Sequence, residues 1–155
     1  MAALGEEVTG IPRGADRAPV WPEGLVGSIS HDQSGAIAIV AKRHRMLGVG
    51  IDIEPAAPLP EELAGSVLMR GERGGDGLSG RAIFSAKECV YKALYPLTGE
   101  VWPFTAIFVR PDPEKDRFEA EVSRAAGPLP AGTILAGTLL IRPDRILTAI
   151  TIKRL

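Results

Sequence analysis

The sequence predicts an α+β fold with mainly antiparallel strands and one strong helix. Short apolar runs of strand length come first, an amphipathic segment follows at 81–95, and strand-like runs return up to the C-terminus. Grouped strands of this kind favour antiparallel pairing. With 155 residues, 45% of them hydrophobic, the chain has the size and apolar content of one domain with a real core.

The strands are placed by apolar runs between turn residues. A loop-rich entry segment containing three prolines precedes the first run. Prolines 55, 58 and 60 end the third run, and residues 61–70 suit a short helix. The expected strands are 25–30, 36–42, 47–54, 104–111, 117–123, 133–143 and 146–152, with a hairpin turn at Pro143-Asp144 between the last two.

The segment RAIFSAKECVYKALY predicts the main helix. Its apolar residues recur near helical spacing, from Ile83 to Leu94. Pro96 is expected to stop this helix, with Gly99 just beyond it.

Composition excludes several classes of protein. A net charge of −1 and a pI of about 6.1 show no global nucleic-acid footprint. No apolar run approaches the roughly 20 residues that a membrane-spanning helix needs. The single cysteine, Cys89, rules out an internal disulfide framework and favours a reducing compartment, so we expect a soluble, cytoplasmic protein.

The stretch GVGIDIE raises the question of why an apolar strand carries two acids. Asp52 and Glu54 are two residues apart, so both side chains leave the same face of the strand and can reach toward one cation. A hard divalent ion such as Mg²⁺ prefers such oxygen ligands. The alternative is that both acids lie in solvent at a strand end. A dinucleotide fingerprint fails because Ile53 replaces the last glycine, and the chain contains no phosphate loop of the G-x-x-x-x-G-K-[ST] type.

The helix motif FSAKECVYKAL places Glu88 and Lys92 on one face, four residues apart, with Lys87 next to that face. In isolation this pattern is most simply a surface ion pair.

The motif SISH places Ser30 and His31 at the end of a strand. Neighbouring strand side chains point to opposite faces, so this pair is not a nucleophile with its base. His31 could bind a phosphate, or it could be a turn histidine without a role. The basic run at 42–45 is expected to form a solvated hairpin turn.

Taken together, SISH, GVGIDIE and FSAKECVYKA resemble the 4′-phosphopantetheinyl transferases in order and interval. The resemblance covers roughly residues 12–104. It is strongest to the branch that serves siderophore and other nonribosomal peptide synthetases, typified by the enterobactin synthetase component D. It implies transfer of the 4′-phosphopantetheine arm of coenzyme A to a serine of an apo acyl or peptidyl carrier protein, with release of 3′,5′-ADP.

The resemblance also implies a role for each motif residue. Asp52, Glu54 and Glu88 would surround Mg²⁺, or Mn²⁺ in its place, and Glu88 is also the candidate general base for the carrier serine. A base that contacts Mg²⁺ should have a low pKa, so whether Glu88 is base or only ligand stays open. Contacts to coenzyme A would come from Lys92, Lys87, His31, Ser30 and Arg17.

In longer members of the family, two similar halves flank the active site. The resemblance implies that residues 1–50 are the remainder of the first half, with nucleotide contacts, and that 51–155 form the second half, with the metal site and main helix. The start MAALGEE resembles the end of a helix that follows a basic segment in those relatives. An incomplete first half would expose an apolar sheet face, which predicts self-association. The alternative to an enzyme is a truncated, inactive module that binds coenzyme A or a carrier protein.

Overall fold

The computed structural model describes residues 5, 10–33, 35–72 and 77–154. The strands are β1 (Leu25–Asp32), β2 (Gly35–Lys42), β3 (Met46–Pro55), β4 (Ile107–Asp112), β5 (Arg117–Val122), β6 (Ile134–Ile141) and β7 (Arg145–Lys153). The helical segments are α1 (Glu61–Val67), α2 (Gly77–Thr98) and two short 3-10 turns, η2 (Phe104–Ala106) and η3 (Pro113–Lys115).

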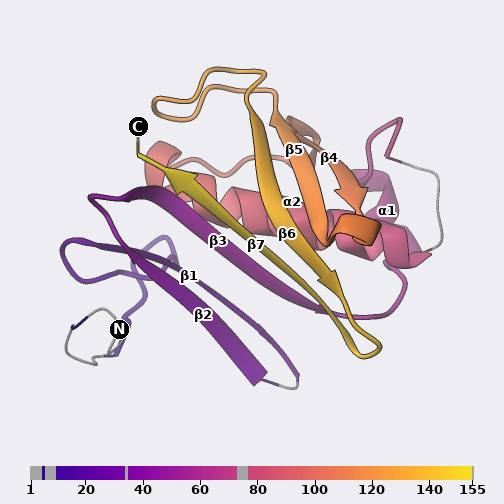
Figure 1. The fold of residues 1–155 in the computed structure, drawn as a ribbon, viewed down its shortest axis with the longest axis horizontal. Coiled ribbons are helices and arrows are strands. Elements are labelled where there is room, and N and C mark those ends of the chain that lie inside the picture. Colours follow the sequence, from indigo (N-terminus) through magenta and orange to yellow (C-terminus); the bar gives the residue numbers. More distant parts are fainter. Residues whose placement is uncertain (1–4, 6–9, 34, 73–76, 155) are drawn as a thin grey trace.

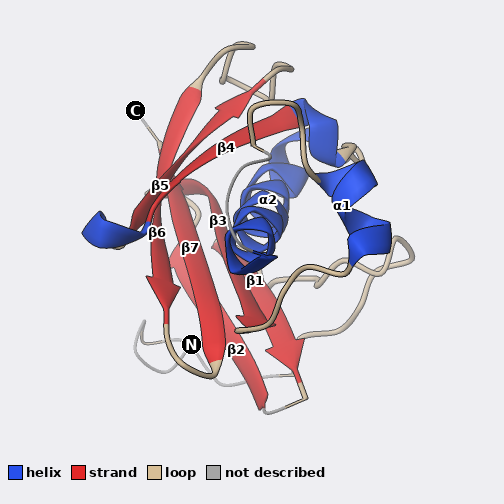
Figure 2. Cartoon of the chain, turned by 90° about the vertical axis from the view of Figure 1, so that its right-hand side faces the viewer, coloured by secondary structure: helices blue, strands red, loops and turns tan. Residues whose placement is uncertain are grey.

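Two antiparallel sheets make up the strand layer, which confirms the predicted α+β class. Five strands pair in the order β3-β7-β6-β5-β4, and β1 pairs with β2 in a separate hairpin. Figure 1 shows this hairpin beside β3, on the side away from β7. Figure 2 shows α2 nearly end-on, with the large sheet on one side and α1 on the other. The sheet therefore curves around α2.

Helix α2 lies directly on the backbone of β3 because two glycines leave room for it. A Cβ atom added at Gly48 would overlap the carbonyl oxygen of Ala93, and one added at Gly50 would overlap that of Cys89. Positions 48 and 50 lie on the same strand face as Asp52 and Glu54, since side chains alternate along a strand. The glycines therefore bring the helix within reach of the two acids.

The main core lies between α2 and the large sheet. Ile83, Val90 and Leu94 of the helix are almost fully buried, and they belong to one cluster with Phe118 and Ile146 of the sheet. Burying each large apolar side chain of this kind contributes about 1.5–3 kcal/mol. This packing fixes the rotation of α2 about its axis.

The helices differ from the sequence-based bounds at four places, the first being that α2 begins at Gly77 rather than at residue 81. α2 continues to Thr98 through Pro96, which was expected to stop it. A proline so close to a helix end removes one hydrogen bond, and Gly99, with a φ of 63°, ends the helix by donating from its N–H to the Tyr95 carbonyl at 2.8 Å. α1 ends at Val67 rather than residue 70, and residues 104–106 form a 3-10 turn before β4.

Other expectations have mixed outcomes. The turn between β6 and β7 is confirmed at 142–144, where the N–H of Arg142 donates to the carbonyl of Arg145.

The expected helix end within MAALGEE lies outside the described residues except for Gly5. Among the described strands β2 pairs only with β1, and self-association through this hairpin stays a prediction. None of the described helices is long and apolar enough to cross a membrane.

We expect Gly50→Ala to destabilise the fold, because its methyl group would overlap the rigid backbone oxygen of Cys89 and push α2 away from β3. Overpacking of this kind costs about 1–3 kcal/mol. Chemical denaturation of the variant measures the loss. Gly65→Ala in α1 is the matched control, since nothing lies within 4 Å of its added Cβ and alanine favours helix. Equal stability of the two variants would contradict the close packing.

Candidate active site

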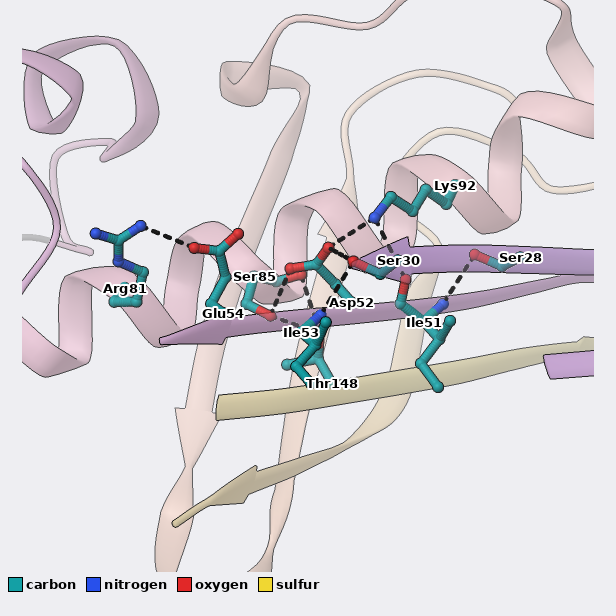
Figure 3. A network of polar contacts seen from close by, with 10 residues as sticks. All are labelled: Ser28, Ser30, Ile51, Asp52, Ile53, Glu54, Arg81, Ser85, Lys92 and Thr148. Atoms are coloured by element: carbon teal, nitrogen blue, oxygen red, sulfur yellow. Dashed lines mark hydrogen bonds and ion pairs between the residues drawn. The ribbon is translucent and has the colours of Figure 1, made fainter. Parts of the chain in front are cut away.

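Asp52 lies at the centre of a buried polar network (Figure 3). The residue is 3% exposed, and its carboxylate accepts hydrogen bonds from Ser30 at 2.9 Å and from Ser85 at 2.8 Å. The ammonium group of Lys92 lies 2.6 Å from the same carboxylate. Ser85 also contacts the Thr148 hydroxyl at 2.9 Å, which extends the network to β7. The alternative of a solvent-exposed Asp52 is therefore wrong.

Two serines of β1 attach the small hairpin to the edge of the large sheet. Ser28 accepts a hydrogen bond from the N–H of Ile51, and Ser30 accepts one from the N–H of Ile53. Moving two residues forward along β1, from Ser28 to Ser30, also moves two residues forward along β3, from Ile51 to Ile53. β1 therefore runs parallel to β3, although the two strands belong to different sheets. The SISH motif thus supplies side-chain acceptors to an edge strand that would otherwise leave N–H groups unpaired.

Glu54 lies two residues beyond Asp52 and pairs with Arg81 of α2 at 2.8 Å. Burial, followed by the charge of Asp52, raises the pKa of Glu54, and Arg81 partly opposes this. Arg81 was not anticipated from the sequence. The only available signal was its position in the first turns of the predicted helix.

Glu88 of α2 lies close enough to the same acids to interact with their charges. Burial is the main cause of its raised pKa, and the charges of Asp52 and Glu54 add to it, while Lys92 opposes them. Among the described residues, Glu88 has no hydrogen bond or ion pair. The surface pair expected between Glu88 and Lys92 is not formed, because Lys92 turns to Asp52 instead. Glu88 therefore remains available to a ligand.

Lys87 is placed differently from the sequence-based expectation. Its side chain is fully buried, and its Nζ pairs with Glu72 at 2.7 Å and donates to the carbonyls of Val67 and Phe104. Glu72 in turn accepts the N–H of Val109 at 2.6 Å. Successive helix residues point about 100° apart, so Lys87 turns away from the face that carries Lys92. The ammonium group of Lys87 is thus already bound within the protein and ties α2 to the segment after α1, and a contact of Lys87 with coenzyme A stays a prediction.

A cavity of about 550 Å³ lies beside Lys92. Three cationic residues line it, Arg17, Arg43 and Lys92, against the one acid Asp16. Asp16 accepts a hydrogen bond from Tyr95 of α2 at 2.6 Å, which holds the entry segment over the helix. The cavity therefore suits an anion.

The structure brings Arg17 to this cavity but separates it from the other expected coenzyme A contacts on β1. Ser30 is 6% exposed and bonded to Asp52, so its hydroxyl supports the acid rather than lining the cavity. His31 is exposed at the end of β1 and lines neither of the two cavities described here. The solvated turn expected at 42–45 is confirmed for residues 43–45, whereas Lys42 belongs to β2. The turn also contributes Arg43 to the cavity, a role that sequence reasoning missed.

A second, smaller cavity of about 180 Å³ lies beside Glu88. Apolar and aromatic residues form most of its wall, including Val101, Trp102 and Phe104, with Lys87 also at its border. The indole N–H of the buried Trp102 has no hydrogen-bond partner among the described residues. Tyr91 lines both cavities, and Lys92 of the first cavity and Glu88 of the second lie four residues apart on α2. We refer to Asp52, Glu54 and Glu88 together as the carboxylate site.

The carboxylate site matches a divalent cation in its donor chemistry. Asp52 raises the pKa of both Glu54 and Glu88, a repulsion that a cation among three oxygen donors would relieve. As placed, no three His, Cys, Asp or Glu residues of the described ranges converge to hold a metal ion. In this arrangement the Asp52 carboxylate pairs with Lys92, and one oxygen of the Glu54 carboxylate pairs with Arg81.

Comparison with known proteins settles the family. A model of the 4′-phosphopantetheinyl transferase N-terminal domain matches residues 1–41, and a model of the 4′-phosphopantetheinyl transferase superfamily matches residues 48–129, more than half of the chain. The chain belongs to the 4′-phosphopantetheinyl transferase superfamily. This confirms the resemblance drawn from SISH, GVGIDIE and FSAKECVYKA.

Curated relatives support the assignment to this transferase superfamily. The chain is 38% identical over 131 residues to the 4′-phosphopantetheinyl transferase Svp of Streptomyces mobaraensis, covering 77% of this chain and 52% of the relative. It is 42% identical over 106 residues to Npt of Nocardia iowensis, covering 63% and 47%. Enterobactin synthase component D of Salmonella typhi is 40% identical over 91 residues, covering 52% and 36%. The chain thus spans about half the length of the curated relatives it matches, or less.

We expect Glu88→Gln to stabilise the chain at neutral pH when no metal is added. Burial raises the folded-state pKa of Glu88 above its ordinary value of 4.5, so the folded state holds this proton more tightly than the unfolded state. The stability that Glu88 lends is complete below pH 4.5 and is lost as pH rises through the folded pKa. Thermal unfolding from pH 4 to 8 should show a gain for the variant that grows with pH. A gain of equal size at every pH would show that desolvation of the charge is not its cause.

Lys87→Met should destabilise the transferase chain by about 3–5 kcal/mol, because it leaves the Glu72 carboxylate buried without its cation. Adding Glu72→Gln to Lys87→Met should recover part of the loss, since the amide carries no charge and still accepts hydrogen bonds. Denaturant unfolding of both variants measures the difference. Wild-type stability in Lys87→Met would rule out the buried pair.

Proposed function

We propose that this chain, or the protein to which it belongs, transfers the 4′-phosphopantetheine group of coenzyme A to a serine of an apo acyl or peptidyl carrier protein. The observation that carries the proposal is the position of Glu88. It is half-buried, has a raised pKa and no described partner, and borders the apolar cavity next to the Asp52–Lys92 pair. A carboxylate in this setting is a stronger proton acceptor than an exposed one.

The two cavities support a ligand with two chemically different ends. The cationic cavity, with Arg17, Arg43 and Lys92, would take the phosphates and nucleotide of coenzyme A. The apolar cavity beside Glu88 would take the pantetheine arm, and the free indole N–H of Trp102 could donate to one of its amide carbonyls. The diphosphate would then lie near Lys92.

The reaction needs a proton acceptor, a nucleophile and charge compensation. The serine oxygen attacks the phosphorus that carries the pantetheine group, a new P–O bond forms, and the diphosphate P–O bond breaks to release 3′,5′-ADP. Glu88 accepts the serine proton, directly or through water, and Lys92 balances negative charge on the diphosphate oxygens. A Mg²⁺ ion held by Asp52 and Glu54, with Glu88 as a third ligand when it does not act as the base, would supply further Lewis-acid stabilisation of that charge.

The proposal extends to the organisation and setting of the protein. Residues 1–50 would supply nucleotide contacts and 51–155 the carboxylates and main helix. The similarity to relatives named enterobactin synthase component D favours a role in siderophore or other nonribosomal peptide biosynthesis, which would place the reaction in the cytoplasm.

The test is incubation of the chain with coenzyme A, Mg²⁺ and an apo peptidyl carrier protein, followed by mass spectrometry of the carrier. We expect addition of one phosphopantetheine group, and a fall in rate of about 10²–10⁴-fold in Glu88→Gln, the usual contribution of a general base. Glu62→Gln, an exposed acid of α1, is the matched control and should keep the wild-type rate.

Two other outcomes would point to different functions. Binding of coenzyme A without any transfer would favour an inactive module that binds coenzyme A or a carrier protein. Absence of both coenzyme A and Mg²⁺ binding by calorimetry would leave only a structural or interaction domain.

A further inference from the structure

Arg81 is held in place by the backbone, independently of any acid. Its Nη2 donates to the carbonyl of Pro58 at 2.9 Å, and its Nε donates to the carbonyl of Ala57 at 3.3 Å. The side chain is only 12% exposed. These contacts join α2 to the loop that follows β3, so the guanidinium group is fixed before it meets a carboxylate.

The remaining contact of Arg81 reaches only one oxygen of Glu54. Nη1 donates to Oε2 at 2.8 Å, and no contact to the second oxygen occurs within the part of the chain that the structure describes. Figure 3 shows Arg81 and Asp52 on opposite sides of the Glu54 carboxylate. The guanidinium group therefore binds Glu54 on the side away from Asp52, and the Glu54 oxygen that Arg81 does not contact stays free for another ligand.

The charge of Arg81 does not use up the capacity of Glu54 to bind a cation. The second oxygen of Glu54 has no partner among the described residues, and Asp52 lies two residues away on the same face of β3. A further positive charge among these carboxylates would still be favourable.

We propose that Arg81 is a positioning residue that fixes the Glu54 carboxylate through one oxygen, so that the other oxygen is presented to a divalent cation shared with Asp52 and Glu88. This rests on the proposed function, which supplies the cation. Partners that orient a ligating carboxylate from outside typically change metal affinity by 10–100-fold when removed.

The opposite role is that Arg81 competes with the cation for Glu54. The backbone contacts argue against it, since Arg81 gains little by following the carboxylate and cannot move toward Asp52 without leaving both carbonyls. The two roles predict opposite signs for the same measurement, because a competitor's removal tightens metal binding.

The experiment titrates Mn²⁺ into the protein with and without coenzyme A and follows free Mn²⁺ by electron paramagnetic resonance. We expect Arg81→Gln to weaken Mn²⁺ binding about 10–100-fold. Arg81→Lys keeps the charge but cannot reach two carbonyls and a carboxylate at once, so it should recover only part of the affinity. Arg110→Gln, which breaks an exposed ion pair with Glu121, is the matched control and should bind like wild type.

Three results would overturn the proposal, and they differ from one another. Tighter Mn²⁺ binding by Arg81→Gln would make Arg81 a competitor. Unchanged Mn²⁺ affinity together with a lower unfolding temperature would make it only a structural link between α2 and the loop. Wild-type protein that binds no Mn²⁺ would remove the metal from the proposed function and this role with it, whereas the first two results leave that function standing.

Discussion

The buried carboxylate of Asp52 is the constraint on which the site depends. A carboxylate that is 3% exposed costs several kcal/mol unless its charge is compensated and its oxygens are hydrogen-bonded. Here Ser30, Ser85 and Lys92 supply that compensation, one from β1 and two from α2. The burial of one acid on β3 therefore fixes the small hairpin, the large sheet and the main helix relative to one another.

The same strand also determines how close the helix can come. Short hydrogen bonds from Ser85 and Lys92 to Asp52 require the axis of α2 to lie near β3, and that distance is open only because Gly48 and Gly50 carry no side chain. The residues at alternate positions of GVGIDIE thus have two different roles. The glycines admit the helix, and the two acids that follow them on the same face meet its polar groups.

Much of this architecture is visible in the sequence, because it depends on local pattern. Alternation and turn residues placed all seven strands, and helical spacing placed α2. Side-chain fates that depend on distant partners were not visible. Lys87 and Lys92 lie five residues apart on one helix, yet Lys87 forms a buried ion pair with Glu72, whereas Lys92 pairs with Asp52 in the candidate site. Arg43 looked like part of a solvated turn, since nothing local shows that the turn borders a cavity.

Lys92 links the two sides of the site and makes them electrostatically interdependent. Its ammonium group pairs with Asp52 and also lines the cationic cavity with Arg17 and Arg43. Negative charge entering that cavity would share Lys92 with Asp52 and strengthen the repulsion already felt by Glu54 and Glu88. A cation among the carboxylates would lower it, so each ligand would favour the other by the same free energy, as linkage requires. The site is therefore better matched to an anion and a cation together than to either alone.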